Sequence, residues 1–283
     1  MTPPSRLRSL LFAPANRPEL APKLARSGAD GVVLDLEDAV PAGEKDAARA
    51  VVGESAATIA GEPDRPFVFV RVNAVPTAWF GADVAAAAAA GVEGIVVPKV
   101  ETTEQLAAVA GALADAGCPD LTVVAGIESA LGVDRAATLL AGDGVAAAYF
   151  GAEDYIADLG GMRTESSNEV LYARSRVVLA ARLAGVATLD QIVTAYQDDA
   201  RFRADAAVGR ALGYRGKLCI HPRQVRLANQ VFGVSPEEAE RARRIVDTYE
   251  EAARRGAGVV SVDGQLVDEP MVRLARALLA EAG

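Results

Sequence analysis

Eight short apolar segments, each followed by a longer helical pattern, fill the first four fifths of the chain. These segments cover residues 7–14, 30–37, 66–73, 93–100, 121–128, 146–154, 185–192 and 215–222, of which the seventh is the weakest. The helical patterns between them include residues 18–28, 42–60, 102–117 and 167–185, and several end in the glycine that favours a left-handed helix terminus. Eight strands that each lead into a helix are typical of a TIM (β/α)8 barrel.

A doubly wound open sheet is the main alternative to a barrel. Such a sheet has fewer strands as a rule, with a glycine-rich GxGxxG turn after its first strand, and this sequence lacks that turn. The composition, 51% hydrophobic but only 5% aromatic, suits a parallel sheet covered by helices. We therefore predict an α/β protein built on a TIM barrel.

Beyond Phe232 the alternation of strands and helices stops. Residues 235–256 form a charged amphipathic pattern that predicts a helix opened by Ser235 or Pro236. Residues 258–270 predict a β-hairpin around Asp263 and Gly264, and a short helix follows over 271–280. We therefore expect a catalytic barrel over residues 1–232 and a lid or oligomerisation extension over 233–283, whose hairpin has no evident core to join in its own subunit.

Charge and composition exclude several classes of partner. The net charge of -9, with 38 acidic against 29 basic residues, argues against nucleic acid. No stretch resembles a membrane span free of charge, and the first residues lack the pattern of a secretory signal. The only cysteines, Cys118 and Cys219, are interpreted as buried thiols in a reducing compartment. We expect a cytoplasmic protein with no membrane partner.

Two acidic residues stand where apolar strands give way to loops, Glu128 in VVAGIESALG and Asp154 in AAAYFGAED. A carboxylate in such a place needs water, hydrogen bonds or a cation. Because no histidine or cysteine lies nearby, hard oxygen ligands favour Mg²⁺ over zinc. We predict that both residues bind one Mg²⁺; the alternative is that each only caps the following helix.

Other charged residues follow the predicted strands. Arg71 ends the strand of residues 66–73, where its planar fork suits a carboxylate or an enolate oxygen, although an ion pair with Asp38 or Glu37 is the alternative. Asp38 is predicted to hold a metal-bound water, or else to cap the next helix or pair with Lys99. The only histidine, His221, favours a structural role and excludes a Ser-His-Asp triad.

The motifs LLFAPANRPE, GVVLDLEDAVP, VRVN, GIVVPKVE, GIESALG, FGAEDYIADLG, GYRGKLCIHPRQV and DGQLVDEP together resemble the CitE-like branch of the HpcH/HpaI aldolase family. They span nearly the whole chain in order. The resemblance implies a homotrimeric TIM barrel that uses Mg²⁺ to make or break a carbon-carbon bond between a CoA thioester and a small 2-oxo acid. By motif it implies Glu128 and Asp154 as metal ligands, and Arg71, with Glu128, as substrate-binding residues.

Further roles follow from the same resemblance. The loop after the first strand is expected to meet CoA, so Arg17 and Lys23 are candidates for its phosphates. An aspartate in the tail is expected to reach a neighbouring subunit's site as an acid or base, and Asp268 in LVDEP matches that motif. PANRP in place of the more usual PGNRP is a departure close to the expected CoA loop.

We therefore expect a lyase that cleaves or condenses a 3-hydroxyacyl-CoA thioester such as citramalyl-CoA or malyl-CoA, with acetyl-CoA and a 2-oxo acid as its products. Two alternatives remain open at this point. One is a citrate lyase beta subunit that acts on a citryl thioester, and the other is a catalytically silent binding or assembly subunit. Pyruvate and glyoxylate differ by one methyl group, which is worth only about 1 to 3 kcal/mol of discrimination.

Overall fold

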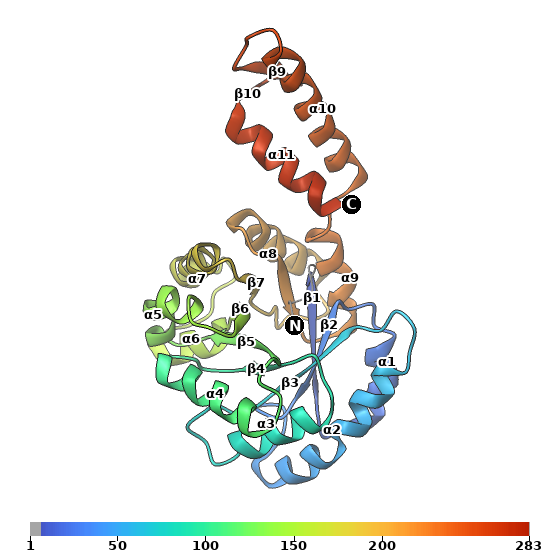
Figure 1. The fold of residues 1–283 in the computed structure, drawn as a ribbon, viewed down its shortest axis with the longest axis vertical. Helices are drawn as coiled ribbons and strands as arrows, with labels where there is room; N and C mark the ends of the chain where they lie inside the picture. The colour runs from blue at the N-terminus through green and yellow to red at the C-terminus, as the bar shows by residue number, and fades with distance from the viewer. Residues whose placement is uncertain (1–6, 283) are drawn as a thin grey trace. The chain divides into compact units, whose positions relative to one another are not determined.

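The computed structural model describes residues 7–282 and contains a closed barrel of eight parallel strands (Figure 1). Each strand pairs with its sequence neighbours, and β8 closes the ring against β1. The prediction of a TIM barrel is therefore confirmed. The strands are β1 (Ser9–Pro14), β2 (Gly31–Asp35), β3 (Phe67–Arg71), β4 (Gly94–Val97), β5 (Thr122–Ile127), β6 (Val145–Phe150), β7 (Ala187–Asp190) and β8 (Gly216–Cys219).

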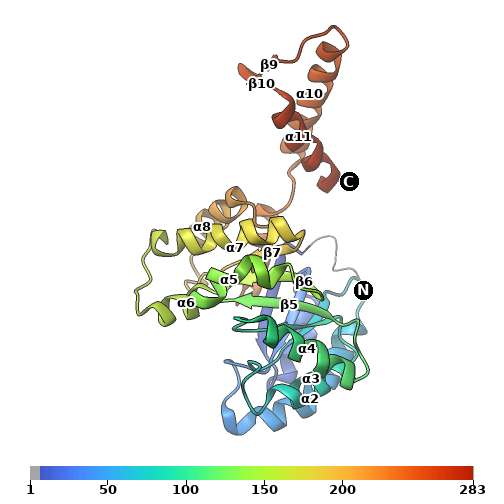
Figure 2. The same cartoon turned by 60° about the vertical axis from the view of Figure 1, so that its left-hand side comes forward.

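Helices cover the outside of the strands, as Figures 1 and 2 show from two directions. Several begin at a side-chain cap, among them the caps Thr102, Ser129 and Asp198, each of which accepts a backbone hydrogen bond from the first turn. The helices are α1 (Ala21–Ala25), α2 (Lys45–Ala60), α3 (Phe80–Ala89), α4 (Thr103–Asp115), α5 (Ala130–Leu140), α6 (Ala152–Leu159), α7 (Leu171–Ala184), α8 (Asp199–Leu212) and α9 (Pro222–Val231), with the short 3-10 helices η1 (Pro18–Leu20), η2 (Ala42–Glu44) and η3 (Asn168–Val170).

The inside of the barrel is a packed apolar core. Alternate residues of the strands point inward, and their side chains fill the space between the strands. Because this interior is closed by side chains, the functional groups of the barrel are displaced to its ends. The buried side chains of this core include Leu10, Val33, Phe69, Val96, Val124, Tyr149, Leu189 and Leu218.

A second compact unit begins at Gln230, and the barrel unit ends at Asn229. The second unit contains α10 (Pro236–Ala253), the hairpin of β9 (Val260–Val262) and β10 (Gln265–Val267), and α11 (Glu269–Ala282). Ser235 caps α10 in a capping box with Glu238. Asp263 and Gly264 both have positive φ, of 50° and 75°, as the two central residues of a type I′ turn require.

The expectation that the hairpin has no core in its own subunit was wrong. Val262, Val267 and Val272 are buried together, and side chains of both helices pack against them. The helix over residues 236–253 is highly charged, so the apolar stripe that faces this core is narrow and gives only a weak signal in the sequence. The partly buried side chains packed against the three valines are Ile245, Val246, Tyr249, Val260 and Met271.

The two cysteines differ in their surroundings. Cys219 is fully buried at the end of β8, and burial raises the pKa of its thiol to about 12. Cys118 is only half-buried, because it lies in the turn after α4, so the expectation that both thiols are buried was wrong for Cys118. Both are free thiols.

Helices of the length and apolarity needed to cross a membrane are not found within residues 7–282.

Candidate active site

The carboxyl ends of β2 to β6 carry a cluster of charged side chains at one rim of the barrel. Active sites of TIM barrels lie at this rim, because the loops that follow the strands meet there. Lys99, in the loop after β4, connects the cluster: its Nζ lies 2.7 Å from Glu37 Oε1 and 3.8 Å from carboxylate oxygens of both Asp38 and Asp154. The structure therefore brings together residues that lie more than 100 positions apart in the sequence.

Glu128 follows β5 and is buried, with only 3% of its surface exposed. Its Oε1 accepts a hydrogen bond from the Lys99 backbone N–H at 2.8 Å. Ser129, not Glu128, caps α5, because Ser129 Oγ accepts from the Gly132 N–H at 3.1 Å. The helix-cap alternative for Glu128 was therefore wrong. Gly151 makes room for the carboxylate, since a Cβ on Gly151 would lie 2.4 Å from Glu128 Oε2.

Lys99 adopts a backbone conformation that is uncommon for a residue with a side chain. Its φ is 53°, in the left-handed region. In this conformation the Lys99 N–H binds Glu128 while its ammonium group binds Glu37. Strained backbone of this kind concentrates at functional sites. Burial lowers the pKa of Lys99, but the hydrogen bond and charge of Glu37 outweigh burial and raise it.

Negative charge is concentrated around Glu128. Burial, together with the negative charges of Glu37 and Asp154, raises the pKa of its carboxyl to about 8. The buried Tyr149 hydroxyl packs against Gly126 and finds no well-aligned hydrogen-bond partner within residues 7–282. A cation bound beside Glu128 would offset the unfavourable burial and repulsion of these carboxylates.

The donor set at this rim fits Mg²⁺. All the candidate ligand atoms are carboxylate oxygens, which Mg²⁺ prefers, and Mg²⁺ commonly keeps water or substrate oxygens in its remaining positions. Among the residues that the structure describes, no three His, Cys, Asp or Glu side chains form a group that could hold a metal ion. A site at Glu128 and Asp154 therefore offers two protein carboxylates and depends on other oxygens to complete it.

Asp154 lies in the first turn of α6, not in the loop before it. Its side chain is 41% exposed, and its Oδ1 is 3.8 Å from Lys99 Nζ. The N-cap of α6 is Gly151, which has no side chain, and the start of the helix has no side-chain cap hydrogen bond. An acidic residue in a first turn is still favoured by the helix dipole. The alternative that Asp154 only caps α6 is therefore not supported by a hydrogen bond, and what remains of it is the favourable interaction with the helix dipole.

Arg71 ends β3 with its guanidinium held on two sides. Its Nε and Nη2 donate to the two oxygens of Asp35 at 2.7 and 2.6 Å, and its Nη1 lies 2.9 Å from Glu37 Oε2. The aromatic ring of Phe12 lies 5.3 Å from the guanidinium carbon. Burial lowers the pKa of Arg71, but the charge and hydrogen bonds of Asp35, together with the charge of Glu37, outweigh burial and raise it. Three of its five N–H groups face these acids, so others remain for a ligand.

Asp35 is the main partner of Arg71, and the motifs did not point to it. It pairs with Arg71 in the register of β2 and β3, and its oxygens also accept from the backbone N–H groups of Glu37 and Ala39. Asp35 therefore fixes both the arginine and the loop that carries Glu37. The sequence feature that could have identified this pair is an acidic residue at the end of one apolar strand and an arginine at the end of the next.

Glu37 takes the central place in the loop after β2, whereas Asp38 lies at its edge. Glu37 is buried between Arg71 and Lys99, and burial raises the pKa of its carboxyl despite these two cations. The Asp38 side chain is 58% exposed, 3.7 Å from Arg71 Nη1 and 3.8 Å from Lys99 Nζ. The N-cap of α2 is Glu44, which excludes Glu37 and Asp38 as caps of that helix. The alternative pairing of Asp38 with Lys99 is present, as an ion pair of 3.8 Å.

The comparison with protein families agrees with this geometry. Residues 8–222 match the sequence profile of the family described as "HpcH/HpaI aldolase/citrate lyase". This chain belongs to the HpcH/HpaI aldolase/citrate lyase family. The match includes every strand of the barrel and all of the rim residues described above.

Relatives within the HpcH/HpaI family cover nearly the whole chain. A citrate lyase subunit beta-like protein of Deinococcus radiodurans is 51% identical over 280 residues, 98% of each chain. A (3S)-malyl-CoA thioesterase of Cereibacter sphaeroides is 36% identical over 275 residues, 97% of this chain and 94% of the relative. The crystal structure of CitE from Mycobacterium tuberculosis, in complex with magnesium, acetoacetate and coenzyme A, matches with a TM-score of 0.81 and 32% identity, and the match covers 99% of each chain. The family assignment includes lyases that act on CoA-related substrates.

Three further residues of this HpcH/HpaI family member were predicted as site residues. Arg17 is exposed before η1, where it pairs with Glu19, and Lys23 lies in the last turn of α1. Arg17 lies in the segment directly after β1, whereas Lys23 lies in the helix that follows it. Asp268 belongs to the second compact unit and precedes α11, where its carbonyl oxygen accepts from the Met271 and Val272 N–H groups.

His221 has a structural environment. Its ring stacks on Tyr196 with centroids 5.1 Å apart, and its Nδ1 accepts from the Arg223 N–H at 3.1 Å. This second contact caps the start of α9. The preference for a structural role over a catalytic base is supported by these contacts.

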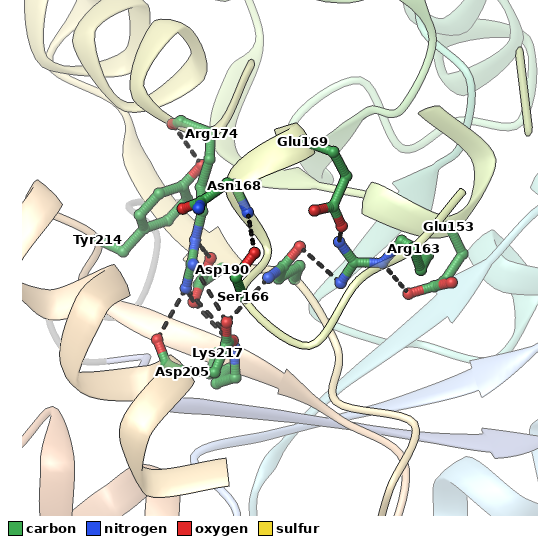
Figure 3. Close-up of polar contacts among 11 residues, drawn as sticks. Glu153, Arg163, Ser166, Asn168, Glu169, Arg174, Asp190, Asp205, Tyr214 and Lys217 are labelled. Atoms are coloured by element: carbon green, nitrogen blue, oxygen red, sulfur yellow. Dashed lines mark hydrogen bonds and ion pairs between the residues drawn. The ribbon is translucent and has the colours of Figure 1, made fainter. Parts of the chain in front are cut away.

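A second charged cluster, which the motifs did not reveal, is formed by residues of β7 and β8 and of the helices α7 and α8 (Figure 3). Lys217 is fully buried, and its Nζ lies 2.8 Å from Asp190 Oδ2 and 2.5 Å from Asp205 Oδ2. Arg174 binds both oxygens of Asp190 at 2.7 and 2.5 Å and also reaches Asp205. The two cations and two acids balance in charge. The sequence feature that could have revealed this cluster is a lysine and an aspartate inside apolar strands.

Proposed function

We propose that this protein is a Mg²⁺-dependent carbon-carbon lyase that cleaves or condenses a 3-hydroxyacyl-CoA thioester such as citramalyl-CoA or malyl-CoA. The products of cleavage would be acetyl-CoA and a 2-oxo acid. The observation that carries the proposal is the buried Glu128 carboxylate, destabilised by Glu37 and Asp154, beside an arginine whose orientation is fixed. A related protein of the same fold binds magnesium, acetoacetate and coenzyme A together, which supports it.

In this proposal Glu128 and Asp154 hold the metal ion. The buried Glu128 is oriented by the Lys99 N–H, and the more exposed Asp154 leaves one side open for water and substrate oxygens. When bound, Mg²⁺ would supply positive charge to the oxygens of the 2-oxo acid. The Lys99 ammonium donates to Glu37 and lies 3.8 Å from Asp154 Oδ1, so it balances part of the negative charge around the two proposed ligands.

Arg71 would bind and orient the acid. Asp35 holds one edge of the guanidinium, so the remaining N–H groups keep a fixed direction and need little reorganisation when a carboxylate or enolate oxygen arrives. Glu37 shares its charge between Arg71 and Lys99 and so ties the two cations to one loop. Asp38 is the exposed acid nearest to both, which is where a water-holding residue would be useful.

The remaining roles are assigned by motif. Arg17 and Lys23 would contact the phosphates of CoA from the loop after β1. Asp268 would exchange a proton with the thioester α-carbon in a neighbouring subunit of a homotrimer, with the C-terminal unit acting as a lid. The compact core of that unit supports this assignment, because a rigid hairpin and helix can hold an aspartate in a defined place.

A screen with purified protein tests the proposal. Malyl-CoA, citramalyl-CoA, hydroxymethylglutaryl-CoA and citryl-CoA are incubated with and without Mg²⁺, and products are identified by mass spectrometry. We expect a 2-oxo acid and acetyl-CoA from one of the first two, only with Mg²⁺. Free CoA and the intact hydroxy acid would instead indicate a thioesterase, cleavage of citryl-CoA alone a citrate lyase subunit, and no product with any thioester a silent subunit.

A further inference from the structure

The first turn of α6 carries Asp154 but lacks the usual means of fixing a helix start. The first N–H groups of a helix need partners, and a side chain at the N-cap commonly provides one. Here the N-cap is Gly151, which has no side chain to offer. The position of this turn, and with it Asp154, is therefore set by contacts other than an N-cap side chain.

Arg163 holds this turn from the loop after α6. Its Nε donates to Glu153 Oε1 at 3.0 Å, and Glu153 is the residue next to Asp154. Its Nη1 donates to Glu169 Oε1 at 2.7 Å, and its Nη2 reaches Gln191 Oε1 at 3.4 Å. Figure 3 shows Arg163 between Glu153 and Glu169, with all three side chains directed toward one another.

The far end of this connection is rigid. Gln191 follows β7 and is fully buried, and its Nε2 donates to Asp205 Oδ1 at 3.0 Å. Asp205 in turn is bound by the buried Lys217 and by Arg174, in the charge-balanced cluster behind β7 and β8. A continuous chain of polar contacts therefore runs from the barrel wall to the residue beside Asp154.

Glu169 holds Arg163 from another direction. Its Oε1 also accepts from the Thr164 N–H at 3.1 Å, and its Oε2 accepts from the Thr164 hydroxyl at 2.6 Å. The loop that carries Arg163 is thus fastened on both sides of the guanidinium. Nothing in the proposed chemistry uses Arg163, which leaves its three directed contacts without another purpose.

We propose that Arg163 is a positioning residue for the metal site: it fixes the first turn of α6 through Glu153 and so sets where the Asp154 carboxylate lies. This inference rests on the proposed function, because it takes Asp154 as a Mg²⁺ ligand. Outer groups that orient metal ligands commonly change metal affinity by about 10- to 100-fold when they are removed.

Charge and positioning predict opposite signs for the loss of Arg163. Removal of a cation close to the site lowers the electrostatic repulsion of Mg²⁺ and, taken alone, strengthens metal binding. Loss of the contact with Glu153 frees the turn and weakens metal binding. The direction of the change therefore distinguishes the two effects.

Isothermal titration with Mg²⁺ tests the inference on wild-type protein and on Arg163→Gln, with the melting temperature and circular dichroism measured in parallel. We expect about 10-fold weaker Mg²⁺ binding in Arg163→Gln. Arg163→Lys keeps the charge but only one of the contacts, so its Mg²⁺ affinity should lie between those of the wild type and Arg163→Gln. The matched control is Arg176→Gln, since Arg176 donates to the Asp134 carbonyl oxygen on the outer helices and should leave Mg²⁺ affinity unchanged.

Unchanged or tighter Mg²⁺ binding in Arg163→Gln would overturn the inference. If that variant does not fold, Arg163→Lys decides, and wild-type affinity in Arg163→Lys overturns the inference equally. Wild-type protein that binds no Mg²⁺ would overturn the proposed function and this inference together. Wild-type protein that binds Mg²⁺ normally, alongside an insensitive Arg163, would overturn this inference alone.

Discussion

Gly151→Ala should damage the site without changing any charged residue. The φ of Gly151 is -99°, which alanine adopts freely, so the backbone itself is not strained. The added Cβ, however, would lie 2.4 Å from Glu128 Oε2 and 2.6 Å from Glu128 Cβ, whereas ordinary contact begins at 3.4 Å. A carboxylate oxygen can rotate away, but a Cβ moves only with its backbone. The end of β5 or the start of α6 must therefore shift.

Overpacking of this kind costs about 1 to 3 kcal/mol of unfolding free energy. For a barrel of this size that corresponds to a fall in melting temperature of about 2 to 12 °C. Mg²⁺ affinity should fall about 10-fold or more, because Gly151 packs against Glu128 and precedes the helical turn that carries Asp154. Differential scanning calorimetry and Mg²⁺ titration measure the two effects.

Gly53→Ala is the matched control, since an added Cβ on this exposed residue of α2 meets no atom within 4 Å. Alanine is the better helix former by up to about 1 kcal/mol, so this variant should be as stable as the wild type or more stable, with the same Mg²⁺ affinity. Wild-type melting temperature and wild-type Mg²⁺ affinity in Gly151→Ala would refute the close packing of Gly151 against Glu128.

Three further predictions concern the two charged clusters and the tail. Arg71→Lys should fold but turn over poorly, because lysine cannot reproduce the fork that Asp35 orients; steady-state kinetics with near-normal kcat would leave Arg71 a structural ion-pair residue. Lys217→Met should lower the unfolding free energy by about 3 to 5 kcal/mol in urea denaturation, because Asp190 loses a buried partner; a loss below about 1 kcal/mol would contradict this. Mixed Asp268→Asn and Arg71→Ala subunits, each nearly inactive alone, should regain activity if Asp268 acts on a neighbouring subunit, and subunits that exchange without any gain would argue against it.

The strands and the hairpin were predictable because their signals are local. Apolar segments of strand length, glycines at helix ends and the Asp263-Gly264 turn all act over a few residues, and the structure has each of them. The capping box at Ser235 is equally local, since its partner lies three positions later. Such features can be derived without knowledge of the fold.

The partners of the charged residues were not predictable in the same way. The choice of Asp35 for Arg71 depends on the register between β2 and β3, in which the two residues lie side by side. The central place of Glu37 depends on Lys99, 62 positions away. These pairings are decided by the closed barrel, so the sequence indicated the right rim but not the order of its ion pairs.

The buried cluster behind β7 and β8 shows the same limit more strongly. Lys217 and Asp190 stand in apolar strands, where a charge usually signals a functional site. Their neutral pairing with Arg174 and Asp205 becomes visible only when two helices are packed on the strands. The hairpin core was missed for a related reason, since it forms between elements that each look marginal alone.

Mg²⁺ binding to Glu128→Gln and Asp154→Asn is the most direct test of the proposed active site. Both substitutions keep the shape of the side chain and remove one negative charge. The account predicts that wild-type protein binds one Mg²⁺ per chain in isothermal titration and that each variant binds it at least about 10-fold more weakly, with unchanged circular dichroism. Wild-type affinity in either variant would contradict the assignment of that residue, and wild-type affinity in both would contradict the central claim.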